Sequence, residues 1–172
     1  MPTITPPAPA TADREQLREL LEGCRLVALT TAASDGLLRS RPVILLEMDA
    51  EARLWFFVSA SSDWVADLEP AVPANVTVAV TTADDSGLWV SVSGRISVVT
   101  DPARVEQLWT SAAEAFFIGP LDPDLRLICQ AADSADYWDT KGVSRYIEMA
   151  KAMDEAPSAD LPIVTGSSPH AL

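Results

Sequence analysis

The side chains that most often carry out chemistry in proteins are scarce in this chain. His170 is the only histidine, and it lies two residues before the end of the 172-residue sequence. Cys24 and Cys129 stand far apart, each inside a mostly apolar run. A histidine-dependent nucleophile needs a rigidly held imidazole, and a zinc site needs a cluster of His or Cys ligands. Neither kind of site is therefore expected, and both cysteines are expected to be reduced core residues.

Acidic groups dominate the remaining charged residues. The chain has 25 Asp and Glu against 12 Lys and Arg, a formal net charge of −13. Such a surface repels phosphate backbones and anionic headgroups, so neither nucleic acid nor a membrane is expected as a partner. Asp63, Asp67 and Glu69 lack the spacing of a metal-binding loop, so no metal site is expected. Without a basic N-terminal start or a run of about 20 apolar residues, the chain is expected to be cytoplasmic.

The composition divides the chain into a central domain and two tails. Residues 1–10 are rich in Pro and Thr, and residues 156–172 carry three Pro and three Ser with little periodicity. Both tails are expected to be flexible, which leaves residues 11–155 as one domain. Asp13 and Gln16 resemble a capping box, and apolar residues at helical spacing follow them, which predicts a helix over 13–22. A short helix near 62–69 and a longer one from the Asp101 cap to before Gly119 are also predicted.

Between these helices the hydrophobic period is two, which is typical of strands. We predict strands at 25–32, 37–48, 53–59, 75–82, 88–100 and 125–131, with turns at Asp35-Gly36 and at 84–87. Residues 88–99 alternate cleanly, with Gly94 as an expected bulge or bend. Six hairpin-linked strands with inserted helices predict a mainly β (α+β) fold. This pattern favours an antiparallel barrel over a doubly wound parallel sheet.

The order of several short motifs points to a known family. The motifs are Leu29-Thr-Thr31, Asp35-Gly36, Arg39-Ser-Arg-Pro42, Leu54-Trp-Phe-Phe57, Val90-Ser-Val-Ser-Gly94, Val105-Glu-Gln-Leu-Trp109, Asp122-Pro123 and Tyr137-Trp-Asp139. Together they resemble the general stress protein branch of the pyridoxamine 5′-phosphate oxidase-like flavoproteins. The resemblance covers residues 15–153 and implies a six-stranded antiparallel split β-barrel with flanking helices. It also implies a homodimer with FMN, or FAD, between the subunits. Some relatives use the deazaflavin F420 instead.

The resemblance also implies a set of cofactor-binding residues. The family's strand arginine corresponds to Arg41, which would approach the ribityl and phosphate groups, and Pro42 and Val43 would flank the flavin ring. Polar contacts would come from the strand and the turn after it. The residues that the resemblance implies there are Val58 and Ser59. Beside the resemblance, Ser61 and Ser62 at the start of the short helix offer hydroxyls and N–H groups to a phosphate, and Trp64 is a further candidate contact. An alternative for Arg41 is an ordinary surface ion pair, for example with Glu47. Trp64 has three alternatives: stacking on a ligand, filling the phosphate pocket, or packing on the barrel.

The chain departs from the family pattern where the phosphate would bind. Relatives carry Lys or Arg-Lys in the turn that here has the sequence Ser59-Ala-Ser-Ser-Asp-Trp-Val65, so Asp63 and Trp64 replace the cations. Glu114 replaces a further cation in the long helix. A phosphate dianion needs cationic or N–H donors, and a nearby carboxylate repels it.

Two hypotheses follow, and neither assigns a catalytic residue. In the first, the chain is a homodimeric, flavin-dependent oxidoreductase in which the cofactor transfers the hydride or the electrons. In the second, it is a degenerate split barrel that has lost flavin phosphate binding and serves as a ligand-binding or interaction module. An F420-dependent reductase is a variant of the first hypothesis. One fold hosts many functions, so fold membership alone does not decide between them.

Overall fold

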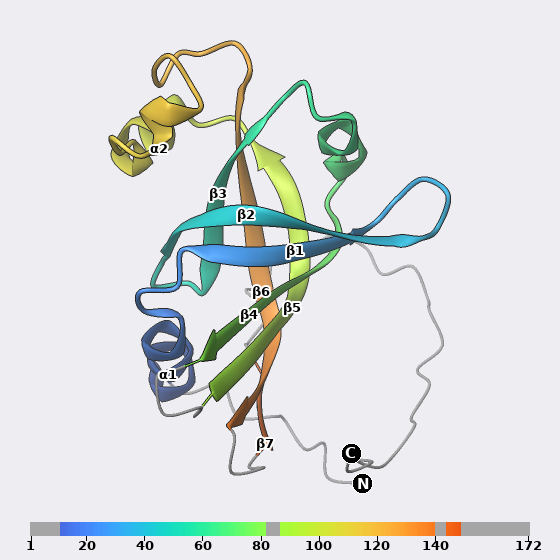
Figure 1. The fold of residues 1–172 in the computed structure, drawn as a ribbon, viewed down its shortest axis with the longest axis vertical. Coiled ribbons are helices and arrows are strands. Elements are labelled where there is room, and N and C mark those ends of the chain that lie inside the picture. Colours follow the sequence, from blue (N-terminus) through green and yellow to red (C-terminus); the bar gives the residue numbers. More distant parts are fainter. Residues whose placement is uncertain (1–10, 82–86, 140–143, 149–172) are drawn as a thin grey trace, which may run out of the picture.

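The strands of the chain form a closed barrel. The structure is a computed structural model that describes residues 11–81, 87–139 and 144–148. The strands are β1 (Leu26–Ala32), β2 (Leu38–Met48), β3 (Arg53–Ser59), β4 (Val72–Thr81), β5 (Gly87–Val99), β6 (Leu125–Asp139) and β7 (Ser144–Glu148). They pair in the order β3-β2-β1-β4-β5-β6-β7, and β3 also pairs with β6. The six strands β1 to β6 therefore close on themselves, and β7 extends the sheet beside β6 (Figure 1). The predicted six-stranded antiparallel barrel is confirmed.

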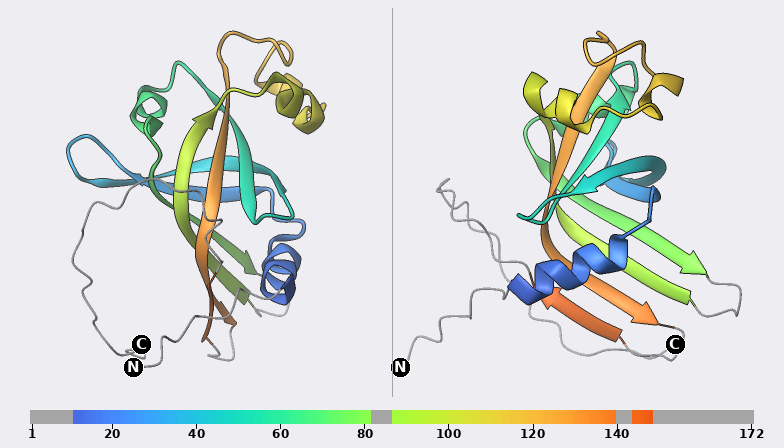
Figure 2. Two further views of the ribbon diagram at one scale, coloured as in Figure 1. Left: turned by 180° about the vertical axis from the view of Figure 1, so that it is seen from behind. Right: turned by 90° about the vertical axis from the view of Figure 1, so that its left-hand side faces the viewer.

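The helices lie near opposite ends of this barrel. Helix α1 (Thr11–Leu21) lies at one end, whereas α2 (Pro102–Leu108) and the short 3-10 helix η2 (Ala113–Ala115) lie at the other (Figure 2). A second 3-10 helix, η1 (Asp63–Leu68), joins β3 to β4. The predicted cap of α2 is confirmed, because the Asp101 side chain accepts a hydrogen bond from the Arg104 N–H at 3.1 Å. None of the helices in the described part of the chain is long and apolar enough to cross a membrane.

The buried apolar residues form two clusters. The larger one fills the barrel, where Leu17 and Leu21 of α1 pack with strand residues such as Leu29 and Phe56. The smaller one packs α2 against β3 and β6, with Trp55 and Cys129 among its buried members. Successive strand residues point to opposite faces, so β3 and β6 contribute to both clusters. One face of these strands closes the barrel interior, and the other carries α2.

Gly94 lies at a bulge between β5 and β6, as predicted. The register of this pair shifts between Ser93 and Gly94. A Cβ atom at position 94 would lie 2.0 Å from the carbonyl oxygen of Ala131. Only a glycine lets the two backbones approach this closely. The extra residue of the bulge, Asp133, lies on β6 opposite the step from Ser93 to Gly94, so it is β6 that bends here.

Several predicted boundaries were wrong. The predicted strand 125–131 continues to Asp139, and β7 was not predicted. Strand β4 begins at Val72 rather than at 75, and α1 covers Thr11–Leu21 rather than 13–22. The predicted helix from 101 to before Gly119 is two elements, because the backbone becomes extended at Trp109. The Trp109 ring packs against Phe57 with ring centroids 6.0 Å apart, which favours this turn over continued helix. The tails predicted at 1–10 and 156–172 lie outside the described residues.

Candidate functional site

A groove of about 820 Å³ runs along β2, past the end of β3 and the start of η1, to the segment after α2. It is lined by residues 41–46 and 57–59, with Arg25, Leu26, Ser62, Trp64, Thr110, Ala112, Ala113, Phe116, Phe117 and Asp124. Most of these side chains are apolar, and the charged ones are two arginines and one aspartate. A groove with apolar walls and a few polar groups is typical of small-molecule sites.

Seven of the eight residues named from the sequence line this groove. They are Arg41, Pro42, Val43, Val58, Ser59, Ser62 and Trp64. Ser61 does not line it, although its hydroxyl oxygen lies 2.6 Å from that of Ser59. The barrel explains this gathering, because β2 pairs with β3 and the turn after β3 leads directly into η1. Residues distant in sequence are thereby brought to one side of the barrel.

Arg41 is held on the aromatic face of Trp64. Its guanidinium carbon lies 4.3 Å from the centroid of the Trp64 ring, and one of its terminal N–H groups donates to the Thr31 hydroxyl at 2.8 Å. Burial is the main cause that lowers the pKa of Arg41, and the nearby Arg39 lowers it further. The alternative of an ion pair with Glu47 is wrong, because Glu47 pairs with Arg104 at 3.0 Å.

Trp64 has a packing role beside its place in the groove. The ring is partly buried and packs against the barrel core. Because Arg41 lies over this ring and both residues line the groove, the two side chains form one wall of it. A cation over an indole face is stabilised by the ring quadrupole, which orients the guanidinium. Of the three alternatives for Trp64, packing on the barrel is therefore realised in this structure.

Asp124 is one of the groove residues that the sequence did not predict, and it is the one carboxylate among them. Its carboxylate accepts a hydrogen bond from the Ser59 hydroxyl at 2.5 Å and another from the Ser61 N–H at 2.8 Å. These hydrogen bonds lower the pKa of Asp124 below its usual value, and the one from Ser59 has the largest effect. The Asp122-Pro123 motif was noted in the sequence, and Asp122 in turn accepts from the Asp124 N–H at 2.8 Å. The motif therefore indicates a turn, but it does not predict that Asp124, the residue after it, contacts Ser59 and Ser61.

The two anions expected to weaken the site do not line the groove. Asp63 is exposed at the start of η1, and its charge acts on Arg39 and Arg41 from outside. Arg39 itself makes two hydrogen bonds to Asp35, at 2.9 and 2.6 Å. Glu114 is exposed on η2. The carboxylate that faces the groove is instead Asp124.

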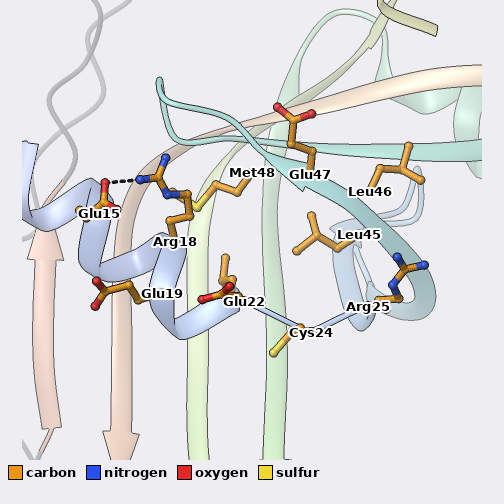
Figure 3. Close-up of a pocket in the computed structure, with 12 residues that line it drawn as sticks. Glu15, Arg18, Glu19, Glu22, Cys24, Arg25, Leu45, Leu46, Glu47 and Met48 are labelled. Atoms are coloured by element: carbon orange, nitrogen blue, oxygen red, sulfur yellow. Dashed lines mark hydrogen bonds and ion pairs between the residues drawn. The ribbon is translucent and has the colours of Figure 1, made fainter. Parts of the chain in front are cut away.

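A second groove, of about 570 Å³, lies between α1 and β2 (Figure 3). Its polar side chains are mainly carboxylates from α1 and from Glu47, and Arg18 pairs with Glu15. Cys24 also lies here as a free, partly buried thiol, and burial raises the pKa of that thiol. Among the residues that the structure describes, no three His, Cys, Asp or Glu side chains converge as they would around a metal ion.

Comparison with known proteins shows which family the chain is similar to. Residues 12–159 match the family model described as pyridoxamine 5′-phosphate oxidase like. The chain belongs to this family. No curated protein matches the chain. The family and branch that the motifs predicted are confirmed by this match and by the solved structures below.

Two solved general stress proteins are similar to the chain over most of its length. One, from Clostridium acetobutylicum, is related to general stress protein 26 of Bacillus subtilis. It is 22% identical, with a TM-score of 0.66, and the match covers 80% of this chain and 95% of that one. The other is the general stress FMN/FAD binding protein of Xanthomonas citri. It is 26% identical, with a TM-score of 0.61, and the match covers 91% of this chain and 100% of that one.

A more distant likeness concerns the fold alone. A heme binding protein from Mycobacterium smegmatis is 13% identical, with a TM-score of 0.64, and the match covers 85% of this chain and 60% of that one. The same barrel therefore occurs in proteins whose names give different ligands, as expected where sites are built on a common fold. The ligand has to be argued from the groove itself.

Proposed function

We propose that the chain is a flavin-binding, oxidoreductase-like protein whose groove along β2 holds the isoalloxazine ring. The observation that carries this proposal is the gathering of Arg41, Pro42, Ser59, Ser62 and Trp64 around one apolar groove of about 820 Å³. The FMN/FAD binding of the similar Xanthomonas citri protein supports it. A bound flavin would supply hydride or electron transfer, and the protein would bind and orient the ring.

The walls of the groove fit a flat heteroaromatic ring. Pro42 and Ile44 are exposed on β2, and Phe57 and Phe116 face the groove from the end of β3 and from the segment after η2. Apolar walls of this kind bury most of a ring of drug-like size, and a few polar groups then orient it. Arg41, stacked on Trp64, is such a group at one end of the groove.

A pair of matched variants tests this proposal. Ala112 lines the groove and is exposed, whereas Ala115 is equally exposed on the same segment but lies outside the lining. Titration with riboflavin, FMN, FAD and F420, followed by tryptophan fluorescence, should show saturable binding of at least one of them by the parent and by Ala115→Trp. Ala112→Trp should bind at least tenfold more weakly, because its indole fills the groove. A parent that binds none of the four, or binding that is unaffected in Ala112→Trp, would refute the proposal.

The protein is further proposed to act as a homodimer whose second copy covers the groove. Phe116 is 74% exposed at the groove, and Ile118 and Leu121 beside it are 92% and 86% exposed. Apolar side chains that are so exposed and so close together are typical of an interface. Light scattering should give about 37 kDa, twice the 18.4 kDa of one chain. Ile118→Asp should shift the protein to monomer, and a monomeric parent would contradict the proposal.

The second candidate is a split barrel that has lost cofactor binding and acts as a ligand-binding or interaction module. The observation that favours it is the Asp124 carboxylate, which already holds two of the hydrogen-bond donors expected to contact the cofactor, those of Ser59 and Ser61. A folded, dimeric parent without affinity for any flavin would support this candidate over the first.

A further inference from the structure

The donors of the turn after β3 are already engaged by an internal anion. The Ser59 hydroxyl and the Ser61 N–H both donate to the Asp124 carboxylate, at 2.5 and 2.8 Å. The Ala60 N–H donates to the Asp124 backbone oxygen at 2.6 Å. A terminal phosphate placed at this turn would have to displace the Asp124 carboxylate from these donors. The phosphate would then lie beside a carboxylate that has lost its hydrogen bonds. Charged acceptors compete for the same donors, so the turn favours whichever anion is already tethered there.

The remaining groups at this end of the groove offer little to a dianion. One N–H of Arg41 is committed to Thr31, and the guanidinium lies against the Trp64 ring. Ser62 precedes η1, a 3-10 helix of only six residues, and its side chain makes no capping hydrogen bond. The other arginine of the groove, Arg25, is held beside Leu45 by a backbone hydrogen bond of 2.7 Å, four residues further along β2 than Arg41 and so away from this turn. The chain has only two lysines, Lys141 and Lys151, and neither is among the described residues.

The part of the groove along β2 that is proposed to hold the flavin ring has few charged groups. Its walls are mainly apolar. The single carboxylate among the lining residues, Asp124, lies at the turn end instead. A neutral ring with a polyol side chain needs apolar contact and hydrogen bonds, which Ser59, Ser62 and Arg41 can share without displacing a charge. A phosphomonoester adds a dianion that must approach Asp124 in a protein whose net charge is already −13.

From this contrast, and resting on the proposed flavin function, we infer that the groove selects flavins without a terminal phosphate, such as riboflavin, and that Asp124 is the residue that disfavours FMN. Asp124 acts in two ways. It occupies the donors of Ser59 and Ser61, and it repels the phosphate group.

The test compares the affinities of riboflavin and FMN for the same purified protein, measured by quenching of flavin fluorescence at moderate salt. Riboflavin should bind more tightly than FMN. FMN binding that is as tight as riboflavin binding, or tighter, overturns this inference and leaves the proposed function intact. Failure of both flavins to bind overturns the proposed function, and this inference with it.

Two variants with the same change of charge locate the effect. Asp124→Asn keeps an acceptor for the Ser61 N–H but removes the negative charge, so FMN affinity should rise about five- to tenfold, as expected for one partly solvated charge. Riboflavin affinity should stay within about twofold of the parent. Glu106→Gln, on an exposed position of α2 outside the groove, should leave both affinities unchanged. An Asp124→Asn protein that is folded by circular dichroism but shows an unchanged ratio of the two affinities refutes the role of Asp124.

Discussion

Replacing Gly94 by alanine should destabilise the barrel far more than a single methyl group suggests. The Cβ atom would lie 2.0 Å from the Ala131 carbonyl oxygen, 2.9 Å from the Ala131 carbonyl carbon and 3.1 Å from the Ala132 Cα. All three are backbone atoms, so no side chain can rotate away to relieve the overlap. The two strands must therefore separate at the bulge.

The size of the effect follows from this overlap. Non-bonded carbon contacts are normally about 3.5–4.0 Å, so the β5 and β6 backbones would have to move apart by about 1 Å or more. The pair runs from Leu88↔Asp139 to Val99↔Leu127, and a displacement at its centre disturbs hydrogen bonds on both sides. Overpacking costs typically 1–3 kcal/mol where side chains can adjust. With backbone on every side, we expect about 3 kcal/mol or more, which lowers Tm by about 6–12 °C in a protein of this size.

Urea unfolding followed by tryptophan fluorescence measures the loss. Gly119→Ala is the matched control, because a Cβ at position 119 meets nothing within 4 Å. The control should lie within about 0.5 kcal/mol of the parent, as most surface changes do. If Gly94→Ala were as stable as Gly119→Ala, the close approach of β5 and β6 would not exist, and the argument from the bulge would fail.

Three further predictions concern titratable and buried groups. The hydrogen bond from the Arg39 guanidinium is the main cause that holds the pKa of Asp35 at about 2 instead of 3.8. The stabilisation that ionised Asp35 gives the fold is therefore present above pH 4 and is lost as the pH falls towards 2. In Arg39→Ala the carboxyl carbon of Asp35 should titrate closer to pH 4 by NMR. Burial raises the pKa of the Cys129 thiol to about 12, so a thiol reagent at pH 8 should label Cys24 in the folded protein and Cys129 only after unfolding, as counted by mass spectrometry. Gln130 is fully buried, and its amide nitrogen donates to two strand carbonyls. In Gln130→Glu the desolvated carboxyl would have a raised pKa, so thermal melts should show a loss of stability that grows between pH 5 and pH 8.

The sequence predicts the fold well where side chains alternate between the core and the other face of a strand. In β5, Val90, Val92 and Ile96 enter the barrel interior, and the period of two is visible without any knowledge of the partner strands. The second half of β6 has no such pattern, since Ala, Asp and Ser dominate residues 131–136. These residues are strands because β5 pairs with them, and this is a long-range interaction that local propensity does not contain.

The candidate site divides in the same way between local and long-range information. The motif resemblance identified Arg41 and Ser59, and the barrel brings them to one groove. Asp124 contacts Ser59 across 65 positions in sequence, and no local spacing indicates such a contact. The sequence showed an aspartate at position 63 and predicted weakened phosphate binding from it. In the structure the carboxylate among the groove-lining residues is Asp124, and it holds the serine donors as well as adding negative charge. The preference proposed for a phosphate-free flavin therefore depends on which donors remain available after folding, and the identity of the groove residues alone would not predict it.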